Sequence, residues 1–335
     1  MMNRNIHYFV YLYTLNRTEM KKYTDISTLK QIIMATCAAA TLCACSSGKA
    51  GDDPIAPPTP PEPEERLPIR ISSAPETRAT DNAFETGDRI GVFVVNRNAD
   101  GSAALLKTSG NYIDNTMYSL YGTWTAAETE YWKDNTTHAD FYMYYPYTST
   151  INNVETLPWS VKADQSTESG YKASELLIGK TLDVAPGEDA VNIRAKHIMA
   201  QVVVTLTAGN GFLPSDISNG DISVRINNMK TLAAANIATG DVSAIGSATD
   251  ITPWRENGIY KALVVPQTLG DGYIIKVTAG GTDFFLKKDA ALKAFEAGHT
   301  YQFTVTLSKT TSGMNATIVK WHDDGNDYGG TAEPE

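Results

Sequence analysis

Apolar and polar side chains alternate with a period of two in several short segments after residue 67. This period is typical of strands with one buried face, because successive side chains of a strand point to opposite sides of the sheet. The clearest case, residues 197–209, places five side chains on one face: Ile198, Ala200, Val202, Val204 and Leu206. The alternation predicts strands in residues 67–74, 88–96, 139–147, 197–209, 221–229, 258–268 and 300–308, and a hairpin in 272–288.

These elements indicate the fold class. The hairpin is predicted to turn at Gly280–Gly281, as a two-residue type I′ or II′ turn. Helical periodicity is limited to one short candidate, residues 289–298. Many short strands joined by polar turns predict an all-β chain built from antiparallel β-sandwiches. We expect two domains, residues 67–210 and 211–321, followed by a polar, Gly-rich tail, residues 322–335.

The three cysteines of the chain, Cys37, Cys43 and Cys45, lie close together near its beginning. They end a segment that has a basic head at residues 21 and 22 and an apolar run from residue 32 to 42, the pattern of a secretory signal. The sequence LCAC (42–45) is similar to a bacterial lipobox, whose last cysteine receives a diacylglyceryl lipid and, in the mature protein, palmitate. We therefore interpret Cys45 as the lipidation site and residues 1–44 as a signal region.

Other interpretations of the cysteines lack partners. A structural disulfide needs a cysteine in the folded region, and residues 46–335 contain none. A tetrahedral zinc site needs further ligands beside the Cys-x-Cys pair, and no histidine lies near it in the sequence. Because the basic head begins after Met20, that residue is the expected start of the signal, and residues 1–19 have no place in it.

The segment after the cysteines predicts a tether. Residues 45–66 are rich in proline and lack alternating apolar positions, so they cannot bury a core and should be extended. Acidic side chains outnumber basic ones in the chain, 38 to 28. This balance argues against a nucleic-acid partner, which needs clustered Lys and Arg, and it fits an exported surface protein.

No motif predicts catalysis, a cofactor or a metal site. The five histidines show no metal-ligand spacing. Gly179-Lys180-Thr181 is similar to the end of a phosphate-binding loop, but Ser174 stands where the first glycine belongs. The acid-rich residues 322–330 do not follow the calcium-loop pattern. Trp124, Trp132, Trp159 and Trp254 are expected in the core, and a sugar-stacking platform is the alternative.

Beyond these elements, a set of short motifs occurs in a fixed order: ETRAT (76–80), FETGDRIGVFV (84–94), YYPY (144–147), AKHIMAQVVVTL (195–206), VPQT (265–268), FEAGHTYQFTVTLSK (295–309) and ATIVKW (316–321). Together with the lipobox, the ordered set resembles the fimbrillin family of Bacteroides and its relatives. These proteins are the pilins and pilin-like lipoproteins of type V fimbriae. The resemblance spans nearly all of the chain after Cys45 and implies two tandem transthyretin-like antiparallel β-sandwich domains.

The resemblance also implies an assembly mechanism. An arginine-specific protease cuts near the N-terminus and releases the lipid, the tether and the first strand, and a strand from another subunit fills the groove. In this sequence Arg78 is the expected cleavage site, and Arg89 is its rival. The expected donor strand is residues 316–321, with Ala316, Ile318, Val319 and Trp321. The alternative is that Arg78 is an ordinary loop residue and that 316–321 pairs within its own domain.

The function implied by the resemblance is that of a fimbrial subunit. Before processing, such a subunit is held at the outer membrane by its lipid. It then binds other fimbrial subunits at the cell surface and contributes to adhesion or biofilm formation. Stalk, tip and anchor roles all stay open. A surface glycan-binding lipoprotein that does not polymerise is the alternative, and an enzyme has no support from any motif.

Overall fold

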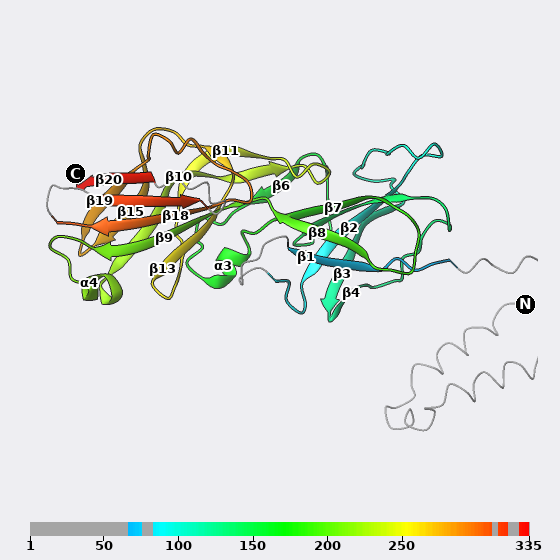
Figure 1. Ribbon diagram of the computed structural model, residues 1–335, viewed down its shortest axis with the longest axis horizontal. Helices are drawn as coiled ribbons and strands as arrows, with labels where there is room; N and C mark the ends of the chain where they lie inside the picture. The colour runs from blue at the N-terminus through cyan, green and yellow to red at the C-terminus, as the bar shows by residue number, and fades with distance from the viewer. Residues whose placement is uncertain (1–65, 76–82, 310–313, 321–327, 335) are drawn as a thin grey trace, which may run out of the picture. The chain divides into compact units, whose positions relative to one another are not determined.

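The computed structural model describes residues 66–75, 83–309, 314–320 and 328–334 of the chain (Figure 1). These residues belong to one compact unit, Pro63–Glu335. The described part is all-β, as predicted. Within it, no helix has the length and apolar character needed to cross a membrane. The predictions for Cys45, Arg78 and Trp321 lie outside the described residues.

The first group of strands forms a closed barrel in the order β1-β4-β3-β2-β5-β7-β8. Its core contains large apolar side chains from every strand, among them Ile90, Phe141 and Ile193, each with no exposed surface. Because a closed barrel has no sheet edge, each strand is hydrogen-bonded on both sides. The strands are β1 (Ile71–Pro75), β2 (Arg89–Asn96), β3 (Ile113–Tyr121), β4 (Thr123–Ala126), β5 (Ala139–Tyr145), β7 (Leu177–Val184) and β8 (Val191–His197).

The second group forms a large sheet in the order β11-β10-β15-β16-β20-β19-β18-β9-β13-β12, with β6 beside β10. The two-stranded pair β14–β17 and the helices α3 (Glu168–Lys172) and α4 (Pro214–Asn219) complete the described elements. The strands are β6 (Leu157–Ser160), β9 (Ala200–Ala208), β10 (Ile222–Ala235), β11 (Val242–Ile251), β12 (Trp254–Glu256), β13 (Ile259–Val264), β14 (Gln267–Thr268), β15 (Tyr273–Ala279), β16 (Thr282–Lys287), β17 (Ala294–Phe295), β18 (Thr300–Leu307), β19 (Met314–Lys320) and β20 (Tyr328–Pro334).

Strands occur in every segment where the alternation predicts one. The predicted inner face of β9 is buried, from Ala200 to Leu206. Two strand pairs are parallel, β1 with β8 and β9 with β18, so the prediction of purely antiparallel sheets is wrong for these pairs. Alternation reports which face of a strand is buried, and it carries no information about the direction of the neighbouring strand.

The hairpin turn is confirmed and its type is resolved. Gly280 and Gly281 have φ values of 56° and 78°. Positive φ at both central residues defines the type I′ turn, which glycine adopts without steric cost. The turn connects β15 to β16 in the predicted place.

The predicted helix at residues 289–298 is wrong. The segment contains turns and the short strand β17, in which Phe295 pairs with Gln267. The Asp289 carboxylate accepts a hydrogen bond from the Ala291 N–H (2.6 Å), which favours a turn over a helix here. Leu292 and Phe295 are both buried, so their helix-like spacing reflects two separate contacts with the core.

Before His197 the described strands belong to the barrel, except β6, which pairs with β10, and from Ala200 onward none of them does. β9 precedes the domain boundary predicted at residue 210, yet it pairs with β13 and β18 of the large sheet. β2 is buried on both faces: Val92 packs in the barrel core, and Phe93 packs in the core that the large sheet shares. The division into two domains stays a prediction.

Candidate functional site

The first strand of the barrel is the centre of the candidate site. β1 runs parallel to β8 with five residue pairs, from Ile71 opposite Val191 to Pro75 opposite Ala195 (Figure 1). On its other side Ile71 lies opposite Trp124 of β4. β1 is therefore the strand that closes the barrel between β8 and β4.

The residues before β1 are also paired on both sides. The Ile69 N–H donates to the Glu130 carbonyl (2.8 Å), and the Leu67 carbonyl accepts from the Trp132 N–H (2.9 Å). On the β8 side, the Val191 N–H donates to the Arg70 carbonyl (2.8 Å). Main-chain hydrogen bonds thus hold the whole segment from residue 67 to residue 75.

The side chains of this segment alternate between the core and the surface. Ile69 and Ile71 are each 5% exposed and pack in the barrel core. The next inward position is Ser73, whose hydroxyl lies 3.0 Å from the Met143 sulfur. A small polar residue at a core position contributes little burial, so the segment is attached mainly by two isoleucines and its backbone.

The chain is anchored again just after the segment that contains Arg78. Phe84 packs edge-to-face on Trp124 (5.1 Å between ring centres) and on Tyr145 (5.4 Å). Residues 76–82 therefore connect Pro75, paired with β8, to Phe84, packed on the barrel. Arg78 belongs by sequence to this connection, outside the described residues.

Charged and phenolic groups surround the segment between Phe84 and β2. The Lys172 ammonium contacts Glu85 (2.7 Å) and Glu168 (2.9 Å), and the hydrogen bond to Glu85 is the main cause that raises the pKa of Lys172. Burial raises the pKa of Tyr145, and its hydroxyl donates to Asp88 (3.1 Å). These contacts hold the chain in place where it enters β2.

Arg89, the rival cleavage site, lies in a different setting. Its side chain is exposed, but its backbone opens β2 and pairs with Ser119. Its carbonyl also accepts the Tyr147 N–H (2.9 Å), and the next residue, Ile90, is fully buried. A protease would have to remove this backbone from the sheet before cutting it, which makes Arg89 the poorer site.

The predicted donor strand coincides with β19. β19 pairs with β18 on one side, where Ile318 lies opposite Phe303, and with β20 on the other, where Ala316 lies opposite Gly330. In this chain the strand is thus paired within its own sheet. This is the arrangement of the alternative prediction, in which 316–321 pairs within its own domain. The role of Val319 and Trp321 as donor residues stays a prediction.

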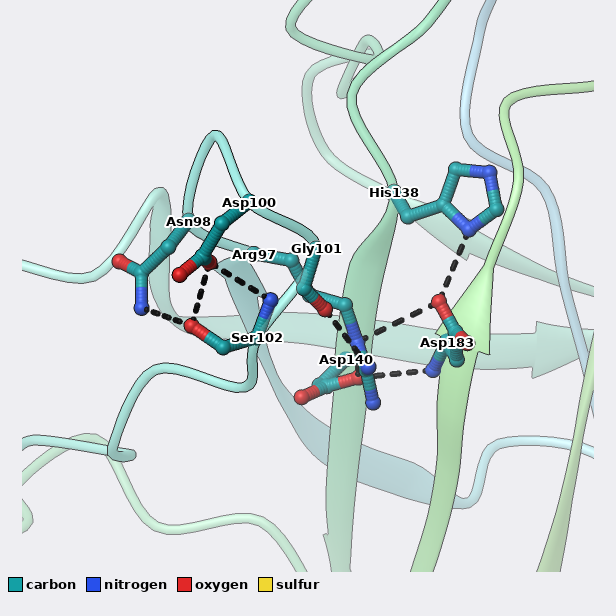
Figure 2. Close-up of polar contacts among 8 residues, drawn as sticks. All are labelled: Arg97, Asn98, Asp100, Gly101, Ser102, His138, Asp140 and Asp183. Atoms are coloured by element: carbon teal, nitrogen blue, oxygen red, sulfur yellow. Dashed lines mark hydrogen bonds and ion pairs between the residues drawn. The ribbon is translucent and has the colours of Figure 1, made fainter.

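A second polar cluster lies at the end of β2, β5 and β7, and Figure 2 shows its members. Asp140 is fully buried and accepts hydrogen bonds from Arg97 Nε (2.9 Å) and from the Asp183 N–H (2.7 Å). His138 Nδ1 lies 2.8 Å from the Asp183 carboxylate, and the hydrogen bond to Asp140 raises the pKa of Arg97. Asp183 has a φ of 58°, which the bond to its N–H helps to maintain.

This cluster has the features of a structural clamp. Arg97 also donates to the Gly101 carbonyl (3.1 Å), so it ties the 98–102 turn to β5 and β7. Among the described residues, no group of three or more His, Cys, Asp or Glu side chains is placed to hold a metal. The arrangement joins three strand ends and presents no activated nucleophile.

The tryptophans divide between core and partly exposed positions. Trp124 and Trp132 are buried, at 7% and 2% exposure, which confirms the core prediction for these two. Trp159 and Trp254 are half-buried; the Trp159 indole N–H donates to the Ser174 carbonyl (3.2 Å), and Trp254 packs near Tyr171. All four are thus buried or half-buried.

Similar proteins come from Bacteroides species. A fimbrium subunit named Fim1C, from Bacteroides uniformis, is 27% identical over 276 residues, which cover 77% of this chain and 85% of the relative. A fimbrium tip subunit, also named Fim1C, from Bacteroides ovatus is 28% identical over 153 residues, which are 41% of this chain and 27% of that protein.

Solved structures share the fold. A cell adhesion protein from Bacteroides uniformis superposes with a TM-score of 0.61 at 24% identity and covers 77% of this chain and 98% of its own. Another from Bacteroides ovatus gives a TM-score of 0.56 at 17% identity, over 81% of this chain and 97% of its own. Residues 77–321 match the family described as fimbrillin-like, and this match begins just after β1. With most of its length in that match, the chain belongs to the fimbrillin-like family.

Proposed function

We propose that this chain is a subunit of a surface fimbrium and that it polymerises by exchanging β1 for a strand of another subunit. Membership of the fimbrillin-like family and a relative named as a fimbrium subunit support the first part. A structural and adhesive role of this kind needs no catalytic site. The second part rests on the position of β1 in the barrel.

One observation carries the proposal: the strand that closes the barrel comes immediately before the segment that contains Arg78. A cut after Arg78 removes the covalent link between β1 and the rest of the barrel. β1 is then held by its hydrogen bonds and by Ile69 and Ile71, whose burial contributes about 3–6 kcal/mol before entropy costs. Its loss leaves the edges of β8 and β4 unpaired beside an apolar core, which is a template for strand addition.

The proposed replacement is the 316–321 segment of a second subunit. A strand presents alternate residues to one face, so the donor offers either Ala316 and Ile318 or Val319 and Trp321 to the groove. The second set contains a tryptophan and buries more apolar area than Ile69 and Ile71 do. A donor strand with larger inward side chains is expected to hold more tightly than β1.

Export and anchoring complete the proposal. The signal region 1–44 directs secretion, the lipid on Cys45 holds the precursor at the outer membrane, and residues 46–66 act as a tether. The proposal assigns one of the two transthyretin-like domains implied by the family resemblance to the barrel and the other to the large sheet. Cleavage at Arg78 releases the subunit from its lipid at the same time as it frees β1.

The experiment uses the chain without residues 1–45, treated with an arginine-specific protease. The expected product begins at Ala79 and forms a ladder of oligomers that resists mild SDS. Arg78→Gln should prevent both cleavage and assembly, whereas the matched variant Arg89→Gln should leave both unchanged. A chain that is cut at Arg78, loses β1 and stays monomeric contradicts the proposal.

A further inference from the structure

The outer surface of β7 and β8 contains a cavity of about 590 Å³. The two strands pair only at the start of β7 and the end of β8, away from the loop that joins them, where Leu177 lies opposite His197 and Gly179 lies opposite Ala195. Closer to that loop, the Thr181 hydroxyl donates a hydrogen bond to the Asn192 carbonyl (2.7 Å). The turn at residues 238–240 forms another wall, so the cavity lies between the barrel and a loop of the large sheet.

Basic side chains dominate the charge of this cavity. Lys180, Arg194 and Lys196 line it, and no Asp or Glu occurs among the described residues that do so. His197, which also lines the cavity, is paired with Glu175 (2.9 Å). In a protein with a formal net charge of −10, an acid-free cavity with three cations is a local reversal of sign.

The strand geometry places the cations together. Arg194 and Lys196 are two residues apart on β8 and both exposed, so they share its outward face. Gly179 allows β7 to approach β8 closely at this point, since a Cβ there would lie 2.5 Å from the Arg194 carbonyl. Lys180 and Arg194 are the next positions beyond the Gly179–Ala195 pair on their strands, and both line the cavity.

Two of these cations retain unused hydrogen-bond donors. The Lys180 ammonium donates to the Ala238 carbonyl (2.8 Å), a neutral acceptor, which leaves its charge uncompensated and two of its N–H groups available. Arg194 makes no side-chain hydrogen bond or ion pair with the described residues, and its guanidinium can bind an oxyanion through two parallel N–H groups. A concave site with charges of one sign concentrates the field on a ligand of the opposite sign.

The other lining groups indicate which uncharged groups an anionic ligand of this cavity would carry. Thr181, Asn192 and Thr239 supply neutral polar side chains, and apart from the His197 imidazole the described lining contains no aromatic ring. The volume lies within the range of small-ligand sites, roughly 300–1,000 Å³. We propose that this cavity binds an acidic saccharide, whose carboxylate or sulfate group contacts Arg194 and Lys180 and whose hydroxyl groups contact the neutral side chains. The cavity uses no side chain of β1 or β19, but Arg194 lies opposite Ala74 of β1, so the inference applies to the uncut chain.

Isothermal titration of the full chain in detergent tests the inference. The probes are a disaccharide with a glucuronate unit, a sulfated disaccharide, a neutral disaccharide, inorganic sulfate and the peptide of residues 322–335. We expect one or both acidic disaccharides to bind, with an affinity that falls as the salt concentration rises, and the neutral disaccharide not to bind.

Variants assign the binding to the cavity. Arg194→Gln and Lys180→Gln should each weaken the acidic disaccharide at least about tenfold, since each removes a charge-assisted hydrogen bond. Lys287→Gln, at an exposed lysine of β16, is the matched control and should change nothing. An unchanged melting temperature for each variant separates lost binding from lost folding.

Four results overturn the inference. The first is that neither acidic disaccharide binds, and the second is that Arg194→Gln and Lys180→Gln bind it as tightly as the original chain. The third is that inorganic sulfate binds as tightly as the sulfated disaccharide, which would limit recognition to the anion. The fourth is that the acidic peptide 322–335 binds in preference to both sugars, which would make the cavity a contact between subunits.

Discussion

Ile71 on β1 lies opposite Trp124 on β4 in antiparallel register. This is the one residue pair between β1 and β4, whereas β1 and β8 share five. On the β4 side the Trp124 indole also donates a long hydrogen bond to the Ser73 carbonyl (3.4 Å). β1 is therefore held unequally by its two neighbours. The β4 side is the expected place where the barrel opens when β1 leaves.

The first prediction concerns the attachment of β1. Ile71→Ala removes a buried side chain and should lower the free energy of unfolding of the uncut chain by about 2–4 kcal/mol. After cleavage at Arg78 and assembly, the same substitution should have no effect, because residue 71 is no longer part of the subunit. Urea unfolding of both forms measures this difference.

Ser72→Ala on the same strand is the control and should leave both forms unchanged, since Ser72 is only half-buried. If Ile71→Ala destabilises the assembled polymer as much as the uncut chain, β1 has been retained.

The second prediction concerns a close approach inside the barrel. A Cβ on Gly91 would lie 2.2 Å from the Tyr144 ring, and that ring is held by its hydroxyl, which lies within hydrogen-bond distance of two acceptors, Asn115 Oδ1 (2.7 Å) and the Thr148 carbonyl (2.9 Å). Gly91→Ala should therefore destabilise the chain by at least about 2 kcal/mol, because the ring has to move out of its packed position. Thermal unfolding checks this value.

Gly187→Ala is the matched control for that substitution. A Cβ at Gly187 meets no atom within 4 Å, so the melting temperature should not fall. Equal stability of the two variants would mean that Tyr144 does not pack on Gly91 as described.

The third prediction concerns the clamp at the barrel end. Asp140→Asn keeps an acceptor for the Asp183 N–H but removes the buried negative charge opposite Arg97. Loss of one partner from a largely buried ion pair should cost about 2–4 kcal/mol of unfolding free energy. Chemical denaturation measures the cost, and Asp221→Asn at an exposed position should be neutral. If Asp140→Asn leaves the free energy of unfolding unchanged, this ion pair does not stabilise the barrel.

The fourth prediction concerns high pH. Burial raises the pKa of Tyr144 to about 12, above the value of about 10 for an unfolded tyrosine. The folded state thus binds this proton more tightly, so the contribution is complete below pH ~10 and is lost as the pH rises toward ~12. Tyr144→Phe cannot ionise and should show a smaller loss of stability between pH 9 and pH 11 than the original chain, measured by urea unfolding. An equal loss in both proteins would assign the alkaline sensitivity to other groups.

Much of the strand content could be predicted from the sequence, because alternation reports burial directly. β9 and β18 follow the pattern over most of their length. In β2 the alternation does not predict burial: Phe93 is as buried as Val92, since two cores lie on opposite sides of the same strand. Layering of this kind depends on elements distant in sequence, which local patterns do not contain.

The candidate site could be predicted only in outline. The expected first strand at residues 67–74 overlaps β1, and the position of Arg78 follows from the sequence, but the parallel pairing of β1 with β8 does not. The sequence drew attention to Lys180 only through a failed resemblance to a phosphate-binding loop. Its place in one cavity with Arg194 depends on the register and separation of β7 and β8, which no local motif encodes.

The central claim is that β1 leaves its place and a strand of another subunit takes it. The most direct measurement is hydrogen exchange of the Val191 amide, which donates to the Arg70 carbonyl (2.8 Å) in the uncut chain. We predict strong protection in the uncut chain, rapid exchange in the cut monomer after β1 is removed, and renewed protection in the polymer. Protection that persists in the cut monomer, or that does not return in the polymer, would contradict strand exchange at this groove.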